Sequence, residues 1–193
     1  LYNNKLETLD ITANSELRWI NVDSNAIAAI NTSAQKNLSL FYAEGNKLSS
    51  VDLSSNPSIT MLHLGGNQLT AIDVSRQSSL SQLKINDNKI ATLDLTKNPY
   101  LYWLNCENNA IAALDLSKNT YVQWISAENN KLTALDLSNN KGVQGLTLQN
   151  NQMSADAINA MIEQLQDVSS VEITDNNSSW ARKLNISYMP GTK

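Results

Sequence analysis

The chain repeats itself every 21 residues, and this period restricts the possible fold more than any other feature of the sequence. Seven copies can be aligned on a first apolar position: Leu17, Leu38, Ile59, Leu80, Leu101, Val122 and Val143. Further apolar residues follow three, five and ten positions later in each copy. The eighth position after the first is always asparagine: Asn25, Asn46, Asn67, Asn88, Asn109, Asn130 and Asn151. A unit this short cannot bury its own apolar face, so neighbouring units must stack on one another.

The order of these columns, LxxLxLxxNxL, is the signature of the leucine-rich repeat. Its LxL part alternates apolar and polar residues, which predicts a short strand with one face inward. Seven such strands, stacked at about 4.8 Å, would form a parallel sheet roughly 30 Å long. A 21-residue unit leaves little room for a helix on the other side. We therefore predict a right-handed solenoid of the α/β class, mostly β, with a parallel concave sheet and a convex side of extended segments and turns.

Two polar columns have a structural interpretation. The asparagine column lies where the chain turns inward, and its amides can satisfy backbone groups that lack a partner in the sheet. In the second half of the unit an aspartate is followed two residues later by serine or threonine, as in Asp94-Leu95-Thr96. Stacked carboxylates about 5 Å apart repel by somewhat under 1 kcal/mol in water. We expect each one to accept hydrogen bonds from the following turn, and we assign the column no catalytic role.

The last 40 residues depart from the period. Residues 154–167 have the apolar spacing of a helix, through Ile158, Met161, Ile162 and Leu165, with Ser154 as the N-cap. Residues 168–176 restate the strand signature, through Val168, Val171, Ile173 and Asn176. Residues 180–188 are expected to finish a cap, with Ile186 and Tyr188 in a last short strand. We therefore divide the chain into repeats at 1–153 and a longer final repeat with a C-terminal cap at 154–193.

The first residue, Leu1, falls on the third apolar position of an earlier copy. The chain thus begins inside a repeat, and a solenoid needs a capping unit over its terminal core. We expect further residues upstream in the natural protein. An export signal would lie in that part.

The strand residues that flank the inward positions should face the concave side. One column there reads Trp19, Leu40, Met61, Gln82, Trp103, Trp124 and Gly145, and the next reads Asn21, Tyr42, His63, Lys84, Asn105, Ser126 and Thr147. An acidic strip runs beside them: Asp23, Glu44, Asp87, Glu107 and Glu128. Our candidate binding residues on this face are Trp19, Tyr42, Met61, His63, Trp103, Trp124, Glu44, Glu107 and Glu128.

Three tryptophans in one exposed column indicate a binding surface, because aromatic residues are enriched at interfaces. Trp103 and Trp124 would lie about 5 Å apart on adjacent strands, close enough to stack. The alternative is that these cross-strand aromatic pairs only stabilise the sheet or support self-association. Stacked indoles would favour a protein ligand, whereas separated indoles with free faces would favour a glycan. The acidic strip would suit a basic or amphipathic partner.

Other classes of function find little support. The net charge of −4 gives no basic face for nucleic acid, and no run of 18 apolar residues could span a membrane. Cys106 belongs to an inward column and is expected to be a buried apolar side chain. His63 is the only histidine, so we expect a ligand contact or an exposed imidazole rather than a catalytic base, and we expect no metal site and no cofactor.

The fifth repeat resembles a known family. Residues 104–109, Leu-Asn-Cys-Glu-Asn-Asn, and residues 114–119, Leu-Asp-Leu-Ser-Lys-Asn, are similar to the LxCxxNxLxxLDLSxNxxL units of the cysteine-containing internalins and to surface proteins of Bacteroides and its relatives. The cysteine ladder itself is absent, because Cys106 is the only cysteine in its column. The resemblance implies a secreted or cell-surface bacterial protein. We therefore expect a non-catalytic, extracellular protein-binding or adhesion module, with a glycan-binding surface protein as the alternative.

Overall fold

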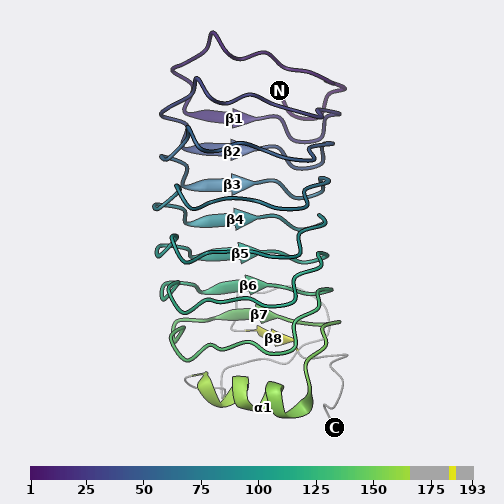
Figure 1. Cartoon of the computed structure of the whole chain (residues 1–193), viewed down its shortest axis with the longest axis vertical. Helices are drawn as coiled ribbons and strands as arrows, with labels where there is room; N and C mark the ends of the chain where they lie inside the picture. The colour runs from purple at the N-terminus through teal and green to yellow at the C-terminus, as the bar shows by residue number, and fades with distance from the viewer. Residues whose placement is uncertain (166–182, 186–193) are drawn as a thin grey trace.

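Each repeat contributes one short strand to a single parallel sheet. The computed structural model describes residues 1–165 and 183–185. Its strands are β1 (Trp19–Asn21), β2 (Leu40–Tyr42), β3 (Met61–His63), β4 (Gln82–Lys84), β5 (Trp103–Asn105), β6 (Trp124–Ser126), β7 (Gly145–Thr147) and β8 (Lys183–Asn185). They lie side by side in chain order (Figure 1). The register from β1 to β7 advances by one 21-residue unit per strand, so the predicted solenoid is confirmed.

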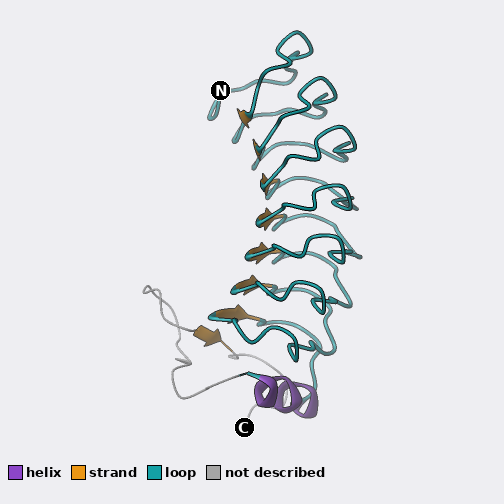
Figure 2. Cartoon of the chain, turned by 90° about the vertical axis from the view of Figure 1, so that its left-hand side faces the viewer, coloured by secondary structure: helices purple, strands orange, loops and turns teal. Residues whose placement is uncertain are grey.

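The two sides of the solenoid differ as predicted. The sheet lines the inner side of a shallow curve, and within the repeats the outer side consists of turns and extended segments (Figure 2). Between them lies a core of stacked apolar columns. Counted from the first apolar residue of each copy, the first, fourth and sixth positions are buried from the second copy onward, as at Leu38, Phe41 and Ala43.

The C-terminal end of the repeats is covered by α1 (Ala155–Gln164), which Figure 1 shows below β7. The Ser154 hydroxyl accepts a hydrogen bond from the Ala157 N–H at 3.2 Å, so the predicted N-cap is confirmed. Ile158 and Met161 are buried against the repeats. The helix ends at Gln164 rather than at 167, because Leu165 takes up an extended conformation with φ −75° and ψ 131°. The strand predicted at 168–176 and the residues Ile186 and Tyr188 lie outside the described residues.

The asparagine of each repeat joins its own turn to the preceding copy. The amide of Asn67 donates to the carbonyl oxygens of Leu64 and Gly65 in its own copy, at 3.0 and 3.3 Å. It also donates to the carbonyl of Ala43 in the copy before, at 2.9 Å. Its Oδ1 accepts the N–H of Leu48 at 3.0 Å. The same arrangement recurs from Asn25 to Asn151, so four backbone groups at each turn are satisfied by one side chain.

A second amide column lies inside the convex wall. Its members are fully buried, and each donates to two carbonyls of the copy before: Gln35, Asn56, Gln77, Asn98, Asn119 and Asn140. Within the described residues, only the Asn56 oxygen among these six has a hydrogen-bond partner, the Thr32 hydroxyl at 2.8 Å. Thr32 occupies a position that is apolar in the other copies, such as Val74.

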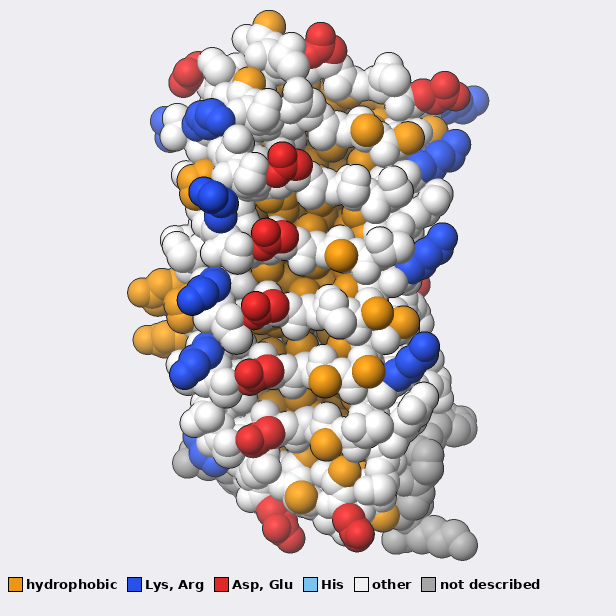
Figure 3. Space-filling model, in the orientation of Figure 1, with side chains coloured by type: hydrophobic (Ala, Val, Ile, Leu, Met, Phe, Trp, Pro, Cys, Tyr) orange, Lys and Arg blue, Asp and Glu red, His pale blue; other side chains and the backbone are white. Residues whose placement is uncertain are grey.

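The aspartates of the convex face line up along the solenoid. Figure 3 shows acidic side chains in a line down this face. Asp94 Oδ1 accepts the backbone N–H of Thr96 at 2.9 Å and its hydroxyl at 2.7 Å. These bonds hold the pKa of Asp94 below its usual range, and the corresponding aspartates of other copies behave alike. The expectation that the column is held by hydrogen bonds from the turns is confirmed.

The Thr32–Asn56 pair gives a matched test of the convex amide column. Thr32→Val removes the one hydroxyl that serves such an oxygen, and we expect the free energy of unfolding to fall by about 1 kcal/mol. Val74→Thr makes the reverse substitution and offers a hydroxyl to the unpaired oxygen of Asn98. Because the new hydrogen bond offsets the burial of the hydroxyl, we expect the free energy of unfolding to change by no more than about 0.5 kcal/mol. Urea unfolding of both variants measures this. A loss of stability in Val74→Thr as large as that in Thr32→Val would contradict the assignment.

Candidate functional site

The side chains of the predicted concave columns lie on the face of the sheet that points away from the core. In β2 to β6 the central residue is buried and the two flanking residues are half-buried. Because Trp103 pairs with Trp124 and Trp19 pairs with Leu40, the first column follows the strands in register. Trp19 is the most exposed tryptophan of the three, at 60%.

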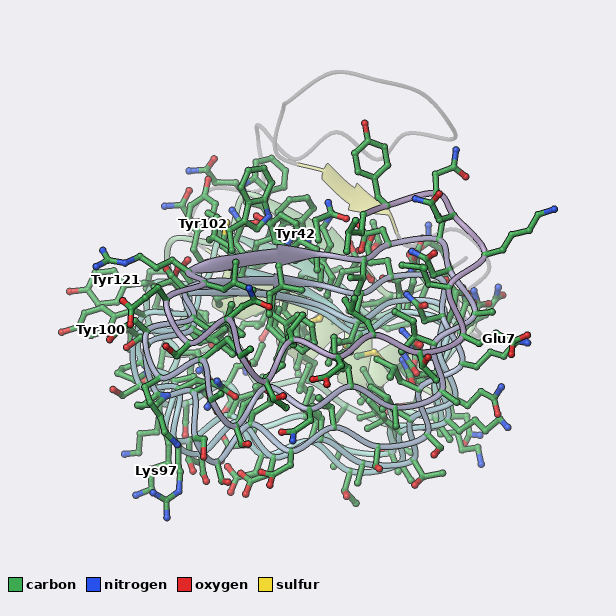
Figure 4. The ribbon with its side chains drawn as sticks, turned by 90° about the horizontal axis from the view of Figure 1, so that it is seen from above. Glu7, Tyr42, Lys97, Tyr100, Tyr102 and Tyr121 are labelled. Carbon is green, nitrogen blue, oxygen red and sulfur yellow. The ribbon has the colours of Figure 1, made fainter. Side chains whose placement is uncertain are left out.

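One aromatic cluster covers β1 to β3. The rings of Tyr42 and His63 are stacked with their centroids 4.5 Å apart, and Trp19 meets Tyr42 edge-on at 6.4 Å. The Tyr42 hydroxyl donates to the sulfur of Met61 at 3.4 Å. Figure 4 shows Tyr42 on the strand side of the molecule. These four candidate residues are therefore brought together.

His63 is neither exposed nor isolated, in contrast to one of the two expectations. It is half-buried under its neighbours, and its Nε2 has no hydrogen-bond partner among the described residues. Burial, followed by the nearby charge of Lys84, lowers the pKa of His63 to about 4. The imidazole is thus neutral at physiological pH and acts as part of an aromatic surface.

Lys84 separates this cluster from a second one. Its ammonium lies 4.6 Å from the centroid of the Trp103 ring, within the range of a cation–π interaction. A third concave column lies beside the first two and consists of Asp23, Glu44, Gly65, Asn86, Glu107, Glu128 and Gln149. Lys84 is the only cationic side chain in these three columns of the seven repeats.

The second cluster surrounds a pocket of about 390 Å³ over β5, β6 and β7. Its lining combines aromatic rings with small polar side chains: Gln82, Tyr102, Trp103, Trp124, Ser126 and Thr147. The Trp124 indole Nε1 donates to the Tyr102 hydroxyl at 3.1 Å. The ring of Trp124 extends over Gly145, where a Cβ atom would clash with it. Gly145 therefore provides the space that the Trp124 ring occupies.

Three tyrosines of this region were not identified as candidates from the sequence: Tyr102, which lines the pocket, and Tyr100 and Tyr121. Tyr100 and Tyr121 are 59% and 62% exposed, and their ring centroids are 5.9 Å apart. Figure 4 places both, with Tyr102, on one flank of the solenoid. The signal was available, because two consecutive copies carry tyrosine where the copies before them carry small or polar residues, such as Ser58 and Ser79. It lay outside the strand columns on which the prediction concentrated.

Four of the five predicted acidic residues share one column: Asp23, Glu44, Glu107 and Glu128. Asp87 does not belong to it, and its assignment to the strip was wrong. Asn86 holds the corresponding position, whereas Asp87 lies one column further, in the turn, with φ +52°. There its carboxylate accepts hydrogen bonds from Asn86 and Asn108, each at 2.7 Å. Asp87 is one of the turn residues that adopt a left-handed conformation, which glycine, asparagine and aspartate tolerate best.

The carboxyl groups of the concave column are partly desolvated. Burial raises the pKa of both Asp23 and Glu44. Burial, together with the adjacent Glu107 carboxyl, raises the pKa of Glu128 to about 7. The Glu107–Glu128 pair therefore retains a proton near neutral pH.

The single cysteine and the acidic side chains can also be compared with the predictions made for them. Cys106 is fully buried, and burial raises the pKa of its thiol to about 12, in agreement with the predicted apolar role. In the part of the chain that the structure describes, no three His, Cys, Asp or Glu side chains gather as metal ligands. The helix described there, α1, has only 10 residues and is too short to cross a bilayer.

Neither the protein-family models nor the curated proteins contain a match to this chain. Solved structures do match. The functional domain of InlJ from Listeria monocytogenes, which includes a cysteine ladder, is 27% identical with a TM-score of 0.66, over 84% of this chain and 41% of that one. The internalin InlF of Listeria monocytogenes is 24% identical with a TM-score of 0.69, over 79% and 48%. A leucine-rich-repeat protein of Leptospira interrogans, LIC12759, is 22% identical with a TM-score of 0.69, over 84% and 51%.

The matches support the predicted resemblance to internalins and the leucine-rich-repeat fold. This chain spans about two fifths to one half of the length of these three structures.

The raised pKa of Glu128 has a measurable effect on stability. The folded state holds the proton more tightly than the unfolded state, so the contribution of Glu128 to stability falls as the pH rises from its ordinary value of 4.5 through about 7. We expect Glu128→Gln to be more stable than the natural chain at pH 8, by about 1 kcal/mol once solvent screening is allowed for. The difference should fade towards pH 4.5. Urea unfolding at several pH values measures it, with the exposed Glu163→Gln of α1 as a control that should show no such trend.

Proposed function

We propose that the chain is a non-catalytic binding module that recognises a protein or peptide on its concave face. The observation that carries the proposal is the pocket over β5 to β7, walled by Trp103 and Trp124. Half-buried aromatic rings beside polar groups are typical of interface anchors. Neighbouring concave residues from Trp19 to His63 extend this surface along the sheet.

We further propose that the protein acts outside the cell, as a secreted or surface-bound adhesion module. The support is the resemblance of the fifth repeat to internalin repeats and the 27% identity to the InlJ domain. The asparagine and aspartate columns are assigned to structure, because their side chains are used in hydrogen bonds to the backbone. This leaves the variable concave positions as the residues that could select a ligand.

A glycan-binding surface protein is the second candidate. The 60% exposure of Trp19 favours it, since a free indole face can serve as a platform for a sugar ring. The surroundings of Trp103 and Trp124 are less suited to stacking against a sugar ring. The ammonium of Lys84 lies against the ring of Trp103, and both indoles are half-buried.

The test removes the pocket walls without touching the core. Trp103→Ala combined with Trp124→Ala should reduce partner affinity at least tenfold, as expected for truncated interface anchors. Partners are captured from cell-surface extracts and identified by mass spectrometry, and each purified candidate is then titrated by calorimetry. A panel of neutral oligosaccharides is titrated in parallel.

The control for this test is Lys97→Ala combined with Lys118→Ala. Both lysines are exposed in the convex turns, and Figure 4 shows Lys97 opposite the strands. This variant should bind as the natural chain does. Equal affinity of the tryptophan variant, with an unchanged unfolding midpoint, would contradict the concave-face proposal. Selective tryptophan-dependent binding of an oligosaccharide would favour the glycan alternative.

A further inference from the structure

We propose that the pocket between Trp103 and Trp124 is a subsite for one arginine or lysine side chain of a polypeptide partner. The aliphatic stem would lie against the indole rings, and the charged end would reach the Glu107 and Glu128 carboxyl groups. The inference rests on the proposed protein-binding function and specifies the chemistry of the partner at one place.

One wall of the pocket, the ring of Trp103, already contacts a cation, although that cation, Lys84, does not itself line the pocket. The ammonium of Lys84 lies 4.6 Å from the centroid of the Trp103 ring. Arginine and lysine combine such a charged end with an apolar stem, so they can cover aromatic surface while the charge stays near polar groups. The rest of the lining suits this combination, with the amide of Gln82 and the hydroxyls of Ser126 and Thr147 among apolar atoms.

The acidic pair is within reach of the pocket. Trp124 and Ser126 both line it, and Glu128 follows two residues later on the same face of the chain. Two residues of extended chain span about 6.6 Å, comparable with the length of an extended lysine or arginine side chain. Glu107 occupies the equivalent position in the preceding copy, beside Glu128.

The charges on this face are not balanced. In β1 to β7 the concave columns hold the four carboxyl groups of Asp23, Glu44, Glu107 and Glu128 against the single cation of Lys84, and Lys183 of β8, which pairs with Gly145, adds a second cationic residue at the end of the first column. Burial raises the pKa of Asp23 and Glu44, and the charge of Lys84 offsets part of that rise, but Glu107 and Glu128 have no ion pair with any lysine or arginine side chain that the structure describes. Burial and the adjacent Glu107 carboxyl raise the pKa of Glu128 to about 7, because two half-buried carboxylates repel each other. A guanidinium or ammonium group placed beside them would let both ionise.

The excess of carboxyl groups on the concave face favours some classes of ligand over others. A neutral sugar would leave the acidic pair uncompensated, and a nucleic acid or other polyanion would be repelled by it. A basic segment of a protein satisfies both the aromatic walls and the carboxyl groups.

The experiment titrates the whole chain with a capped tri-arginine peptide and with the matching tri-citrulline peptide, which has nearly the same shape and no charge. Binding is followed by tryptophan fluorescence and by NMR shifts of the indole N–H groups. We expect tri-citrulline to bind at least tenfold more weakly. Glu107→Gln combined with Glu128→Gln should weaken tri-arginine binding at least tenfold with an intact fold.

A matched control carries the same change of charge on the convex face. Asp115→Asn combined with Asp136→Asn should keep both turns, because Asn31 already fills this position in another copy and accepts the N–H of Ser33 at 3.0 Å. This variant should bind tri-arginine as the natural chain does. Equal losses in the two double variants would show long-range attraction and overturn the subsite.

Equal affinity for the two peptides would also overturn the subsite, as would tryptophan-dependent binding of a neutral oligosaccharide without tri-arginine binding. The proposed function is tested separately. If tri-arginine fails while Trp103→Ala with Trp124→Ala still abolishes capture of a protein partner, the subsite is wrong and the protein-binding function stands.

Discussion

The structure depends on side-chain amides that replace the backbone partners a short strand cannot supply. Each strand has only three residues, so most backbone groups of a copy lie in turns. Left unpaired in the interior, such groups would cost free energy comparable with lost hydrogen bonds. Asn67 and its equivalents satisfy them on the strand side, and Asn98 and its equivalents do so on the convex side. Together with the backbone hydrogen bonds between copies, these two series keep the apolar columns in register.

Because the amide and apolar columns stabilise each copy, the residues on the concave face can differ from one copy to the next. The inward columns and the two amide columns recur in every copy, whereas among the residues flanking the strand centre only some, such as Asn21 and Asn105, accept a hydrogen bond from the backbone. The aromatic residues are accordingly not periodic. Tyrosine and tryptophan concentrate in the fifth and sixth copies, and the seventh copy contributes Gly145, over which the Trp124 ring lies. The pocket is a local departure from a regular frame.

The sequence predicted the frame well because periodicity is a property of position alone. The strands, the inward side of Cys106 and the N-cap Ser154 all follow from spacing. What spacing could not predict is how side chains meet across copies. The stacking of His63 on Tyr42, the placement of Lys84 over Trp103 and the raised pKa of Glu128 depend on rotamers and burial. Asp87 was misplaced by one column, and a shift of one residue is enough to change the face on which a side chain lies.

The asparagine column also has a direction, because each amide bonds backward to the copy before it and none depends on the copy after it. Whole units can therefore be gained or lost between two copies while every junction keeps the same bonding pattern. A partial unit would break the pattern at once. A step of 21 residues gained or lost outside the copies that carry β4 to β7 would thus change the length of the solenoid and leave the lining of the aromatic pocket in register.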